Sequence, residues 1–343
     1  MSTAASSSGC LRNQSSGYKR GQIIGRQVPV VRVLPPAVGF RWPAAGERPL
    51  STVRRSVCRA TVKGPCCPPE SEPFMAPPAD YNPAGREVVV TSMGKPMRVY
   101  IVGDSVPGRK VGIIVAHDIF GGASGRHKLI CDQLSDTCGA VVCMPDLFHD
   151  SYPSDEKELP LWKIPLYLPT AFSQIVRRKW SPGVLRDVES AVSVLSGLGV
   201  ERVGMMGFCY GAWVVMRGSG AEADRLPEVC CGVSVHPSVH QIVGFEGTSE
   251  EEIVRAVRSP QLVLSTTSEP AAWRAGGDVH RWLASLPGAA GRGSKVVNLP
   301  GGLLHGFCTR GNASNPAVLA GVRQVMDEAA AFFETHLTSP GEE

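Results

Sequence analysis

Residues 202–217 read RVGMMGFCYGAWVVMR, and this stretch decides the fold class. Its first five residues form an apolar run of strand length, and the residues from 212 onward favour a helix. Between them lies GFCYG, in which Gly207 and Gly211 flank Cys209. A G-x-S-x-G sequence between a strand and a helix is a nucleophile elbow, whose glycines let strand and helix cross closely. The stretch therefore predicts an elbow that carries an exposed thiol instead of a hydroxyl.

The rest of the chain alternates short β-branched runs with helical patterns from about residue 85 onward. Strands are predicted at residues 87–91, 97–102, 111–115, 140–144, 202–206, 232–235, 261–265 and 295–298. Helices are predicted at residues 126–138, 184–196, 212–217, 250–257, 278–286 and 316–336. The later strands are apolar without alternation, as expected when helices cover both faces of a parallel sheet. We therefore expect an α/β fold with a mostly parallel central sheet of about eight strands and helices on both faces.

The chain of 343 residues, with 43% hydrophobic and 19% charged residues, can bury a sizeable core. Residues 66–343 are expected to form a single domain. Residues 147–181 are too long for a simple turn and carry prolines and aromatic residues, which predicts a lid-like insertion. No run approaches the roughly 18 apolar residues of a membrane span, so we expect no membrane partner.

The net charge of +4 is the sum of two unlike parts. Residues 1–69 hold eleven Lys or Arg and one acidic residue, a net charge of +10, whereas the remaining 24 basic and 30 acidic residues give −6. A negative body disfavours nucleic acid as a partner. The Ser- and Arg-rich segment 1–65 is typical of a transit peptide and ends near VCRA at 57–60, which looks like a V-x-A cleavage site with one residue more. We expect import into a plastid rather than a mitochondrion, or a cytoplasmic protein if this segment is an uncleaved basic tail.

Eleven cysteines are present, and an intracellular address predicts that they are reduced thiols. The sequence contains no C-x-x-C and no H-E-x-x-H, so a structural or catalytic zinc site has no support. It also contains no G-x-G-x-x-G after a strand and no P-loop, the patterns that bind nucleotide cofactors. We expect neither a metal nor an organic cofactor.

An elbow of this kind requires an acid and a histidine, in that chain order, from loops after later strands. His305 follows the last predicted strand and has a glycine beside it, so it suits the role of base. Glu269 ends the strand predicted at 261–265, whereas Asp278 lies nine residues later at a helix start, where it would serve as an N-cap. Glu269 is the better candidate for the acid. His236 ends the strand after the elbow helix and is expected to line the pocket, and His127 falls on a predicted helix surface.

Four motifs, together with Arg310, resemble those of the dienelactone hydrolase family, from about residue 66 to about residue 336. They are GFCYGA at 207–212, HDIFGG at 117–122, MPDLF at 144–148 and HGF at 305–307. The resemblance implies an α/β-hydrolase fold with Cys209 as nucleophile, Glu269 as acid and His305 as base.

The resemblance also implies roles for residues outside the triad. The backbone N–H groups of Ile119 and Tyr210 would form the oxyanion hole. Asp118 stands where bacterial members carry a glutamate that holds the resting thiol, and Arg310 lies near the position of an arginine that meets the substrate carboxylate. The shorter Asp118 weakens the case for the same gating. The family acid is usually Asp, but Glu269 leaves the triad chemistry intact.

These observations predict a monomeric or weakly dimeric hydrolase of a small ester, lactone or thioester that works through an acyl intermediate on Cys209. The alternative is a non-catalytic or redox-sensing protein that keeps the fold and uses Cys209 as an oxidisable thiol. A complete triad favours the enzyme, because a sensor requires neither an ordered acid nor an oxyanion hole.

Overall fold

The structure of the chain, a computed structural model, describes residues 71–72, 77, 80–149, 173, 175–176, 178–220 and 223–338. The predicted transit peptide at 1–65 lies outside the described residues. So does most of the insertion predicted at 147–181, of which only the two ends and three internal residues are described.

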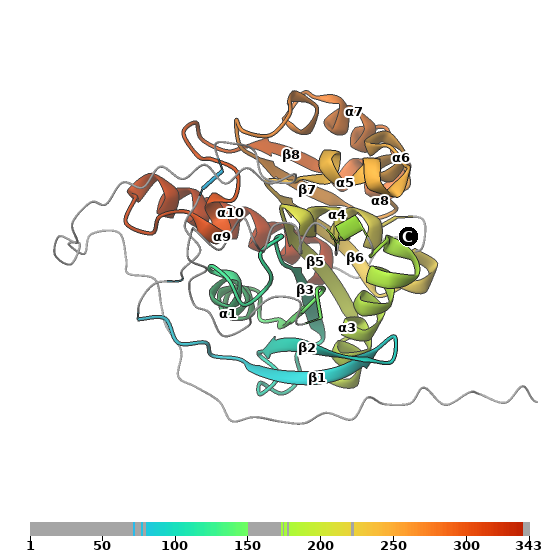
Figure 1. Cartoon of the computed structure of the whole chain (residues 1–343), viewed down its shortest axis with the longest axis vertical. Helices are drawn as coiled ribbons and strands as arrows, with labels where there is room; N and C mark the ends of the chain where they lie inside the picture. Colours follow the sequence, from blue (N-terminus) through green and yellow to red (C-terminus); the bar gives the residue numbers. More distant parts are fainter. Residues whose placement is uncertain are drawn as a thin grey trace, which may run out of the picture.

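Eight strands form one sheet in the order β1-β2-β4-β3-β5-β6-β7-β8. They are β1 (Arg86–Ser92), β2 (Lys95–Val102), β3 (Val111–Ala116), β4 (Val141–Pro145), β5 (Arg202–Phe208), β6 (Val229–Val235), β7 (Gln261–Ser265) and β8 (Lys295–Asn298). Strand β2 pairs antiparallel with both β1 and β4, and all other neighbours are parallel. The predicted α/β-hydrolase fold, with a mostly parallel sheet of eight strands, is confirmed. In Figure 1, β1 and β2 lie at one edge of the sheet and β7 and β8 at the other.

The described helices are α1 (His127–Cys138), α3 (Leu185–Gly197), α4 (Tyr210–Gly218), α5 (Val239–Glu246), α6 (Glu250–Arg255), α7 (Asp278–Ala284), α8 (Gly288–Gly293), α9 (Phe307–Arg310) and α10 (Pro316–Phe333). The six predicted helices are present, but α5, α8 and α9 were not predicted. Helix α9 is a single turn, α8 reads GAAGRG, and α5 holds a glycine, so none has the periodicity that would reveal it.

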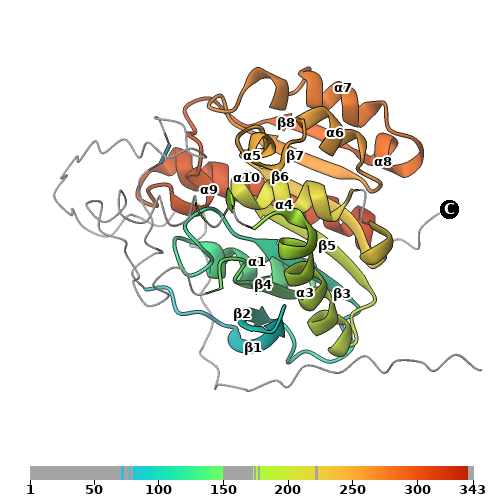
Figure 2. The ribbon, with the colours of Figure 1, turned by 45° about the vertical axis from the view of Figure 1, so that its right-hand side comes forward.

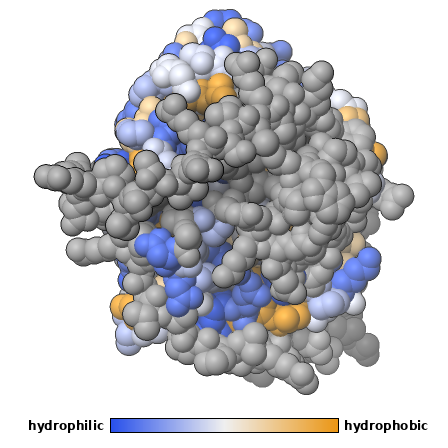
Figure 3. Space-filling view, turned by 60° about the vertical axis from the view of Figure 1, so that its left-hand side comes forward, coloured by the Kyte–Doolittle hydropathy of each residue, from blue (hydrophilic) through white to orange (hydrophobic). Residues whose placement is uncertain are grey.

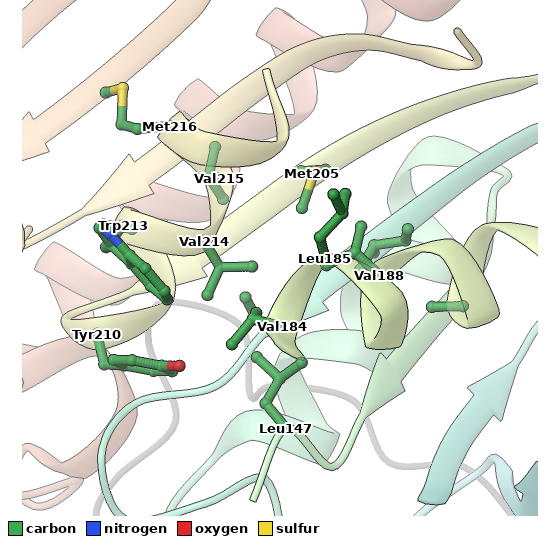
Figure 4. Packing of buried hydrophobic residues seen from close by; sticks show 14 of the residues in the cluster. Leu147, Val184, Leu185, Val188, Met205, Tyr210, Trp213, Val214, Val215 and Met216 are labelled. Carbon is green, nitrogen blue, oxygen red and sulfur yellow. The ribbon is translucent and has the colours of Figure 1, made fainter. Parts of the chain in front are cut away.

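Two hydrophobic clusters lie on opposite faces of the sheet, because successive strand residues point to opposite sides. In β3, Ile114 joins the cluster under α3, α4, α6 and α7, whereas Ile113 and Val115 join the cluster under α1 and α10. Figures 1 and 2 show these two helical layers on either side of the strands. Figure 4 shows the first cluster, where Val214 of α4 lies above Val184 at the start of α3. This double cover holds the ends of the parallel strands rigidly, and the candidate site lies at those ends.

Exposed large apolar side chains are spread over several elements of the described chain. They are Val89, Met93, Val106, Val176, Leu198 and Phe245. On the face drawn in Figure 3, the described residues that can be seen include both hydrophilic ones and a few small hydrophobic patches. None of the helices among the described residues combines the length and the apolar character that crossing a membrane requires.

Candidate active site

Cys209 lies at the turn between β5 and α4. Its backbone has φ 53° and ψ −108°, a positive φ that a non-glycine residue rarely adopts. The Cys209 N–H donates to the carbonyl of Val235 on the neighbouring β6 (3.1 Å), and the Cys209 carbonyl accepts from the Ser238 N–H (3.1 Å). The surrounding backbone therefore holds the turn in its strained conformation. The side chain is only 1% exposed, so the expectation of an exposed thiol is wrong.

The glycines on either side of Cys209 are required by close backbone crossings. A Cβ at Gly207 would lie 2.1 Å from the Gly211 carbonyl oxygen, and a Cβ at Gly211 would lie 2.1 Å from the carbonyl oxygen of Ala116. Real Cβ atoms do not approach backbone oxygens so closely, so each position excludes every other residue. The predicted close crossing of strand and helix is confirmed. It also brings the start of α4 against the end of β3.

His305 and Glu269 form a buried pair beside this turn. His305 Nδ1 lies 2.9 Å from Glu269 Oε1, and both residues are 1% exposed. The second oxygen of Glu269 accepts from the backbone N–H of Thr266, just after β7. Asp278, the other candidate acid, is instead half exposed and paired with Arg281 at the start of α7, where Gly277 is the N-cap. The structure thus brings Glu269 to His305 and leaves Asp278 on the surface.

The electrostatics of the pair follow from burial and the neighbouring charges. Burial alone would lower the pKa of His305, but Cys209 and Glu269 favour its charged form and raise the pKa to about 9. Burial would raise the pKa of Glu269, but the hydrogen bond and charge of His305 outweigh this and the pKa lies below its ordinary value. Both shifts favour a charged imidazolium beside a charged carboxylate.

Ser238 is a site residue that the sequence analysis missed. Its hydroxyl oxygen lies 3.4 Å from Cys209 Sγ and 3.3 Å from His305 Nε2, and the residue is fully buried. Its position was a usable signal, because it follows β6, the strand next to β5. Residues that follow adjacent parallel strands meet at the same edge of a sheet, where ligands bind in open α/β folds.

His236 lies under the His305 ring. The two ring centroids are 5.0 Å apart, and His236 also packs against the rings of Phe208 and Phe307. Neither ring nitrogen of His236 has a hydrogen-bond partner among the described residues. Burial, reinforced by the His305 charge, lowers the pKa of His236 to about 3, so the ring is neutral. We expected this residue to line the pocket, and the structure places it fully buried among aromatic rings.

Asp118 and Arg310 lie together in the interior near the end of β3. One Asp118 oxygen accepts from the Phe120 N–H (2.8 Å), and the other accepts from the Thr309 hydroxyl (2.8 Å). Arg310 Nε lies 3.7 Å from the second oxygen, and its guanidinium covers the Phe120 ring at 4.4 Å from the centroid. Thr309 was not identified from the sequence. Its contact joins α9, which follows His305, to the loop after β3.

Two buried histidines fix the loop that carries Ile119. His117 accepts from the Leu147 N–H at Nε2 (3.0 Å), so Nδ1 carries the proton and donates to the Asp118 carbonyl (2.7 Å). His127 accepts from the Asp118 N–H at Nε2 (3.1 Å) and donates from Nδ1 to the Ser124 carbonyl (2.7 Å). The expectation that His127 lies on a helix surface is wrong, because it is fully buried. Both rings hold the backbone beside the elbow.

The loop around His305 is braced from outside the triad. The buried Arg126 guanidinium donates to the carbonyls of Cys308 (3.2 Å) and Phe307 (2.5 Å). The Glu72 N–H donates to the His305 carbonyl (2.9 Å), so a segment from the beginning of the described chain lies against the same loop. These contacts hold the imidazole beside Cys209.

Groups of three or more His, Cys, Asp or Glu side chains that could hold a metal ion do not occur among the described residues. The site holds a thiol, an imidazole and a carboxylate that follow one another in space, next to backbone N–H groups at the start of α4. Such a set can carry out nucleophilic acyl transfer.

Comparison with known proteins identifies the family of this chain. The sequence model of the dienelactone hydrolase family matches residues 97–268, half of the chain. Hydrolase tropI of Talaromyces stipitatus is 23% identical over 266 residues, covering 75% of this chain and 94% of that protein.

Solved structures with similar folds include the dienelactone hydrolase of Anabaena variabilis (TM-score 0.48, 15% identity, 75% of this chain, 99% of that one). The esterase of Pyrobaculum calidifontis is another (TM-score 0.48, 16% identity, 73% of this chain, 84% of that one). On the extent of the family match, this chain belongs to the dienelactone hydrolase family and is a hydrolase that acts on ester bonds.

Proposed function

We propose that the protein hydrolyses a small ester, lactone or thioester with Cys209 as the nucleophile, His305 as the base and Glu269 as the acid. One observation carries the proposal. The Glu269–His305 pair, with a separation of 2.9 Å, faces a thiol at a strained strand-to-helix turn. A buried carboxylate holds the imidazole in one tautomer, with Nε2 directed toward the thiol side.

Acylation follows from this arrangement. The proton of the Cys209 thiol passes to His305 Nε2, and the thiolate attacks the substrate carbonyl carbon. The carbonyl oxygen becomes an oxyanion, which the N–H groups of Ile119 and Tyr210 stabilise. When the carbon–oxygen bond to the leaving group breaks, His305 returns its proton to the departing oxygen. The products are an alcohol and an acyl thioester on Cys209.

Deacylation repeats the steps with water. His305 takes a proton from the water as its oxygen attacks the thioester carbonyl, and the same two N–H groups stabilise the second oxyanion. The carbon–sulfur bond then breaks, the free acid leaves, and the thiolate and imidazolium are restored. With a lactone the alcohol and the acid are parts of one molecule, so the hydroxyl end formed by ring opening stays attached to the enzyme through the acyl group until this step.

Arg310 is the cation that would meet a substrate carboxylate. Its guanidinium already lies 3.7 Å from Asp118, so an anionic substrate would share that charge with a buried carboxylate. Asp118 is itself engaged by Phe120 and Thr309, which supports a role in shaping the oxyanion loop. Turnover of a carboxylate-bearing lactone and of its methyl ester tests the role of Arg310. Faster turnover of the acid supports it, and equal turnover argues against it.

The experiment that tests the proposal is a rapid-mixing assay with an activated aryl ester, followed by mass spectrometry of the protein. We expect a burst of the phenol and an acyl group on Cys209. Reversible oxidation of Cys209 by peroxide, with neither burst nor turnover, would favour the redox-sensing alternative. Once hydrolysis is established, a screen of metabolite esters and lactones identifies the substrate.

We also propose that residues 1–65 direct the protein to a plastid, in line with their net basic, acid-poor composition. Residues 1–65 fused to a fluorescent protein should enter the organelle, and residues 66–343 fused in the same way should remain in the cytosol. Cytosolic fluorescence from the full-length fusion contradicts the proposal, and mitochondrial fluorescence corrects the organelle.

A further inference from the structure

Ser238 occupies a position between the two reacting groups of the proposed mechanism. It follows β6 and precedes α5, and its hydroxyl oxygen lies 3.4 Å from Cys209 Sγ and 3.3 Å from His305 Nε2. The residue is fully buried. Its backbone N–H donates to the Cys209 carbonyl (3.1 Å), so the serine is fixed directly to the elbow.

Ser238 does not cap helix α5 with its side chain, although it occupies the N-cap position. Ser238 is the N-cap of α5, where a serine side chain ordinarily accepts a hydrogen bond from the second or third backbone N–H of the helix. Here the side chain makes no capping bond. By contrast, Ser249 caps α6 in the ordinary way and forms a complete capping box with Glu252. The Ser238 hydroxyl is directed instead toward the thiol and the imidazole.

We propose that Ser238 is a positioning residue whose hydroxyl bridges Cys209 and His305 and stabilises the thiolate–imidazolium pair. This inference rests on the proposed function, since it assumes that Cys209 is the nucleophile. A hydroxyl suits the position because it accepts one hydrogen bond and donates another at the same time.

The bridge is compatible with both protonation states of the pair. In the neutral pair, the Cys209 S–H donates to Ser238 Oγ, and the Ser238 O–H donates to the unprotonated Nε2 of His305. In the charged pair, the Nε2–H donates to Ser238 Oγ, and the Ser238 O–H donates to the thiolate. Conversion transfers one proton from the thiol to Nε2, with which Cys209 also has a direct side-chain hydrogen bond, and leaves the serine with one proton as before. Hydrogen bonds to charged groups are stronger than neutral ones, which favours the charged pair.

The consequence is a lower pKa for the Cys209 thiol than the triad alone provides. Removal of the hydroxyl withdraws a donor from the thiolate and an acceptor from the imidazolium. We expect Ser238→Ala to raise the apparent pKa of the thiol by about one unit. Turnover below that pKa should fall about tenfold, in proportion to the thiolate fraction.

The test measures alkylation of Cys209 in the full-length protein by iodoacetamide across a range of pH, with the site quantified by mass spectrometry. The midpoint of the profile is the decisive quantity, because a change in access to the buried thiol alters the rate at every pH alike. Ser238→Ala should move the midpoint upward by about one unit. Ser238→Gly, which an N-cap also tolerates, provides the same test if the alanine variant fails to fold.

Ser234→Ala is the matched control. Ser234 is a fully buried serine on β6, the strand that Ser238 follows, and its hydroxyl has no hydrogen-bond partner among the described residues. Its removal should leave the midpoint unchanged. A midpoint that moves equally in both variants would reveal a general effect of buried serines and overturn the inference. So would an unchanged midpoint in Ser238→Ala and Ser238→Gly.

The same experiments separate the inference from the proposed function. If Cys209→Ala is inactive while the Ser238 variants keep the wild-type midpoint, the inference alone fails. If Cys209→Ala remains active, the proposed function fails with it. Loss of all activity in Ser238→Ala together with an active Cys209→Ala would make Ser238 the nucleophile and overturn both.

Discussion

The described part of the molecule contains two carboxylate–imidazole pairs with the same separation and a buried carboxylate in each. His305 Nδ1 lies 2.9 Å from Glu269 Oε1, and His149 Nε2 lies 2.9 Å from Asp187 Oδ1. Glu269 and Asp187 are both almost completely buried. The pairs differ in what surrounds them. His305 presents its second nitrogen to Ser238 and Cys209, whereas Asp187 also accepts from Ser92 (2.6 Å) and pairs with Arg178.

This difference shows that the distance between a carboxylate and an imidazole does not reveal what the pair does. Asp187 is shared among donors from β1, from the residues after β4 and from the residues before α3, so it holds three segments together. Glu269 serves one imidazole and one backbone N–H, which leaves that imidazole to act on a third group. Such a pair can assist a reaction only when the second nitrogen of the imidazole faces a nucleophile.

The largest effect should come from removing that nucleophile. Cys209→Ala should abolish hydrolysis, because the remaining imidazole has no thiol to activate. The fold should persist, since the change removes one sulfur atom and adds no group that must fit the close crossing. Initial rates on an activated ester and a thermal melt measure both quantities. Full activity in protein free of host esterases would contradict the assignment of Cys209.

The second effect should come from the acid. Glu269→Gln should lower turnover by roughly 10²- to 10⁴-fold, because the imidazole loses the charge that orients it and stabilises its protonated form. Asp278→Asn is the control, since Asp278 is half exposed and pairs only with Arg281 among the contacts described. Comparison of kcat for the two variants decides between the candidate acids. A larger loss in Asp278→Asn would reverse the assignment.

The third effect concerns pH. The pKa of His305 is raised to about 9, so the protonated imidazole that donates to the leaving group is lost as the pH rises through that value. Activity should therefore fall about tenfold per pH unit above about 9. The pair also stabilises the fold fully below the ordinary pKa of 6.5, and this stabilisation is lost as the pH rises to about 9.

The alkaline limb of the activity profile also distinguishes the two carboxylates. Glu269→Gln should move this limb to lower pH, because Glu269 contributes to the raised pKa of His305. Asp187→Asn should leave it in place. A limb that does not move in Glu269→Gln would show that another group sets it.

The smallest effect on chemistry should come from Asp187. Asp187→Asn leaves the partly buried Arg178 and His149 without their buried anion, which should cost less unfolding free energy than the about 3–5 kcal/mol of a fully buried pair. The activity of the folded protein should remain near that of the wild type. Urea denaturation followed by turnover at low urea measures the two separately. If Asp187→Asn lost much of its turnover while its stability stayed unchanged, the His149–Asp187 pair would also act in the reaction, and the distinction between the two pairs would be wrong.

The sequence predicts the strands better than it predicts the site. All eight strands were found, because most of them are short apolar runs bounded by glycine, proline or polar residues. The pairing of Glu269 with His305 followed from chain order and the ends of strands. Ser238 was missed although it follows a predicted strand, because α5 lacks the periodicity that would have identified this serine as an N-cap. So was the contact of Asp118 with Thr309, which joins residues 191 apart and depends on tertiary packing alone.

The burial of Cys209 is the other property that the sequence did not predict. The elbow motif indicates that the nucleophile projects above the sheet, and this suggested exposure. Whether other segments cover it depends on the loops that meet there, and local sequence does not specify them. Cys209 is 1% exposed in the folded chain.

The brace between Arg126 and α9 has a consequence for the order in which the protein is made. Arg126 and Phe307 are 181 residues apart, and the base of the triad precedes this turn. During synthesis, Cys209 leaves the ribosome almost a hundred residues before His305. Until His305 has also been made, the thiol lacks the imidazole, and the turn of α9 that Arg126 contacts is absent as well. Domains generally acquire their structure as units. The nascent chain therefore carries a cysteine without its imidazole, and the reactivity that we propose for Cys209 arises only after His305 and Phe307 have been translated.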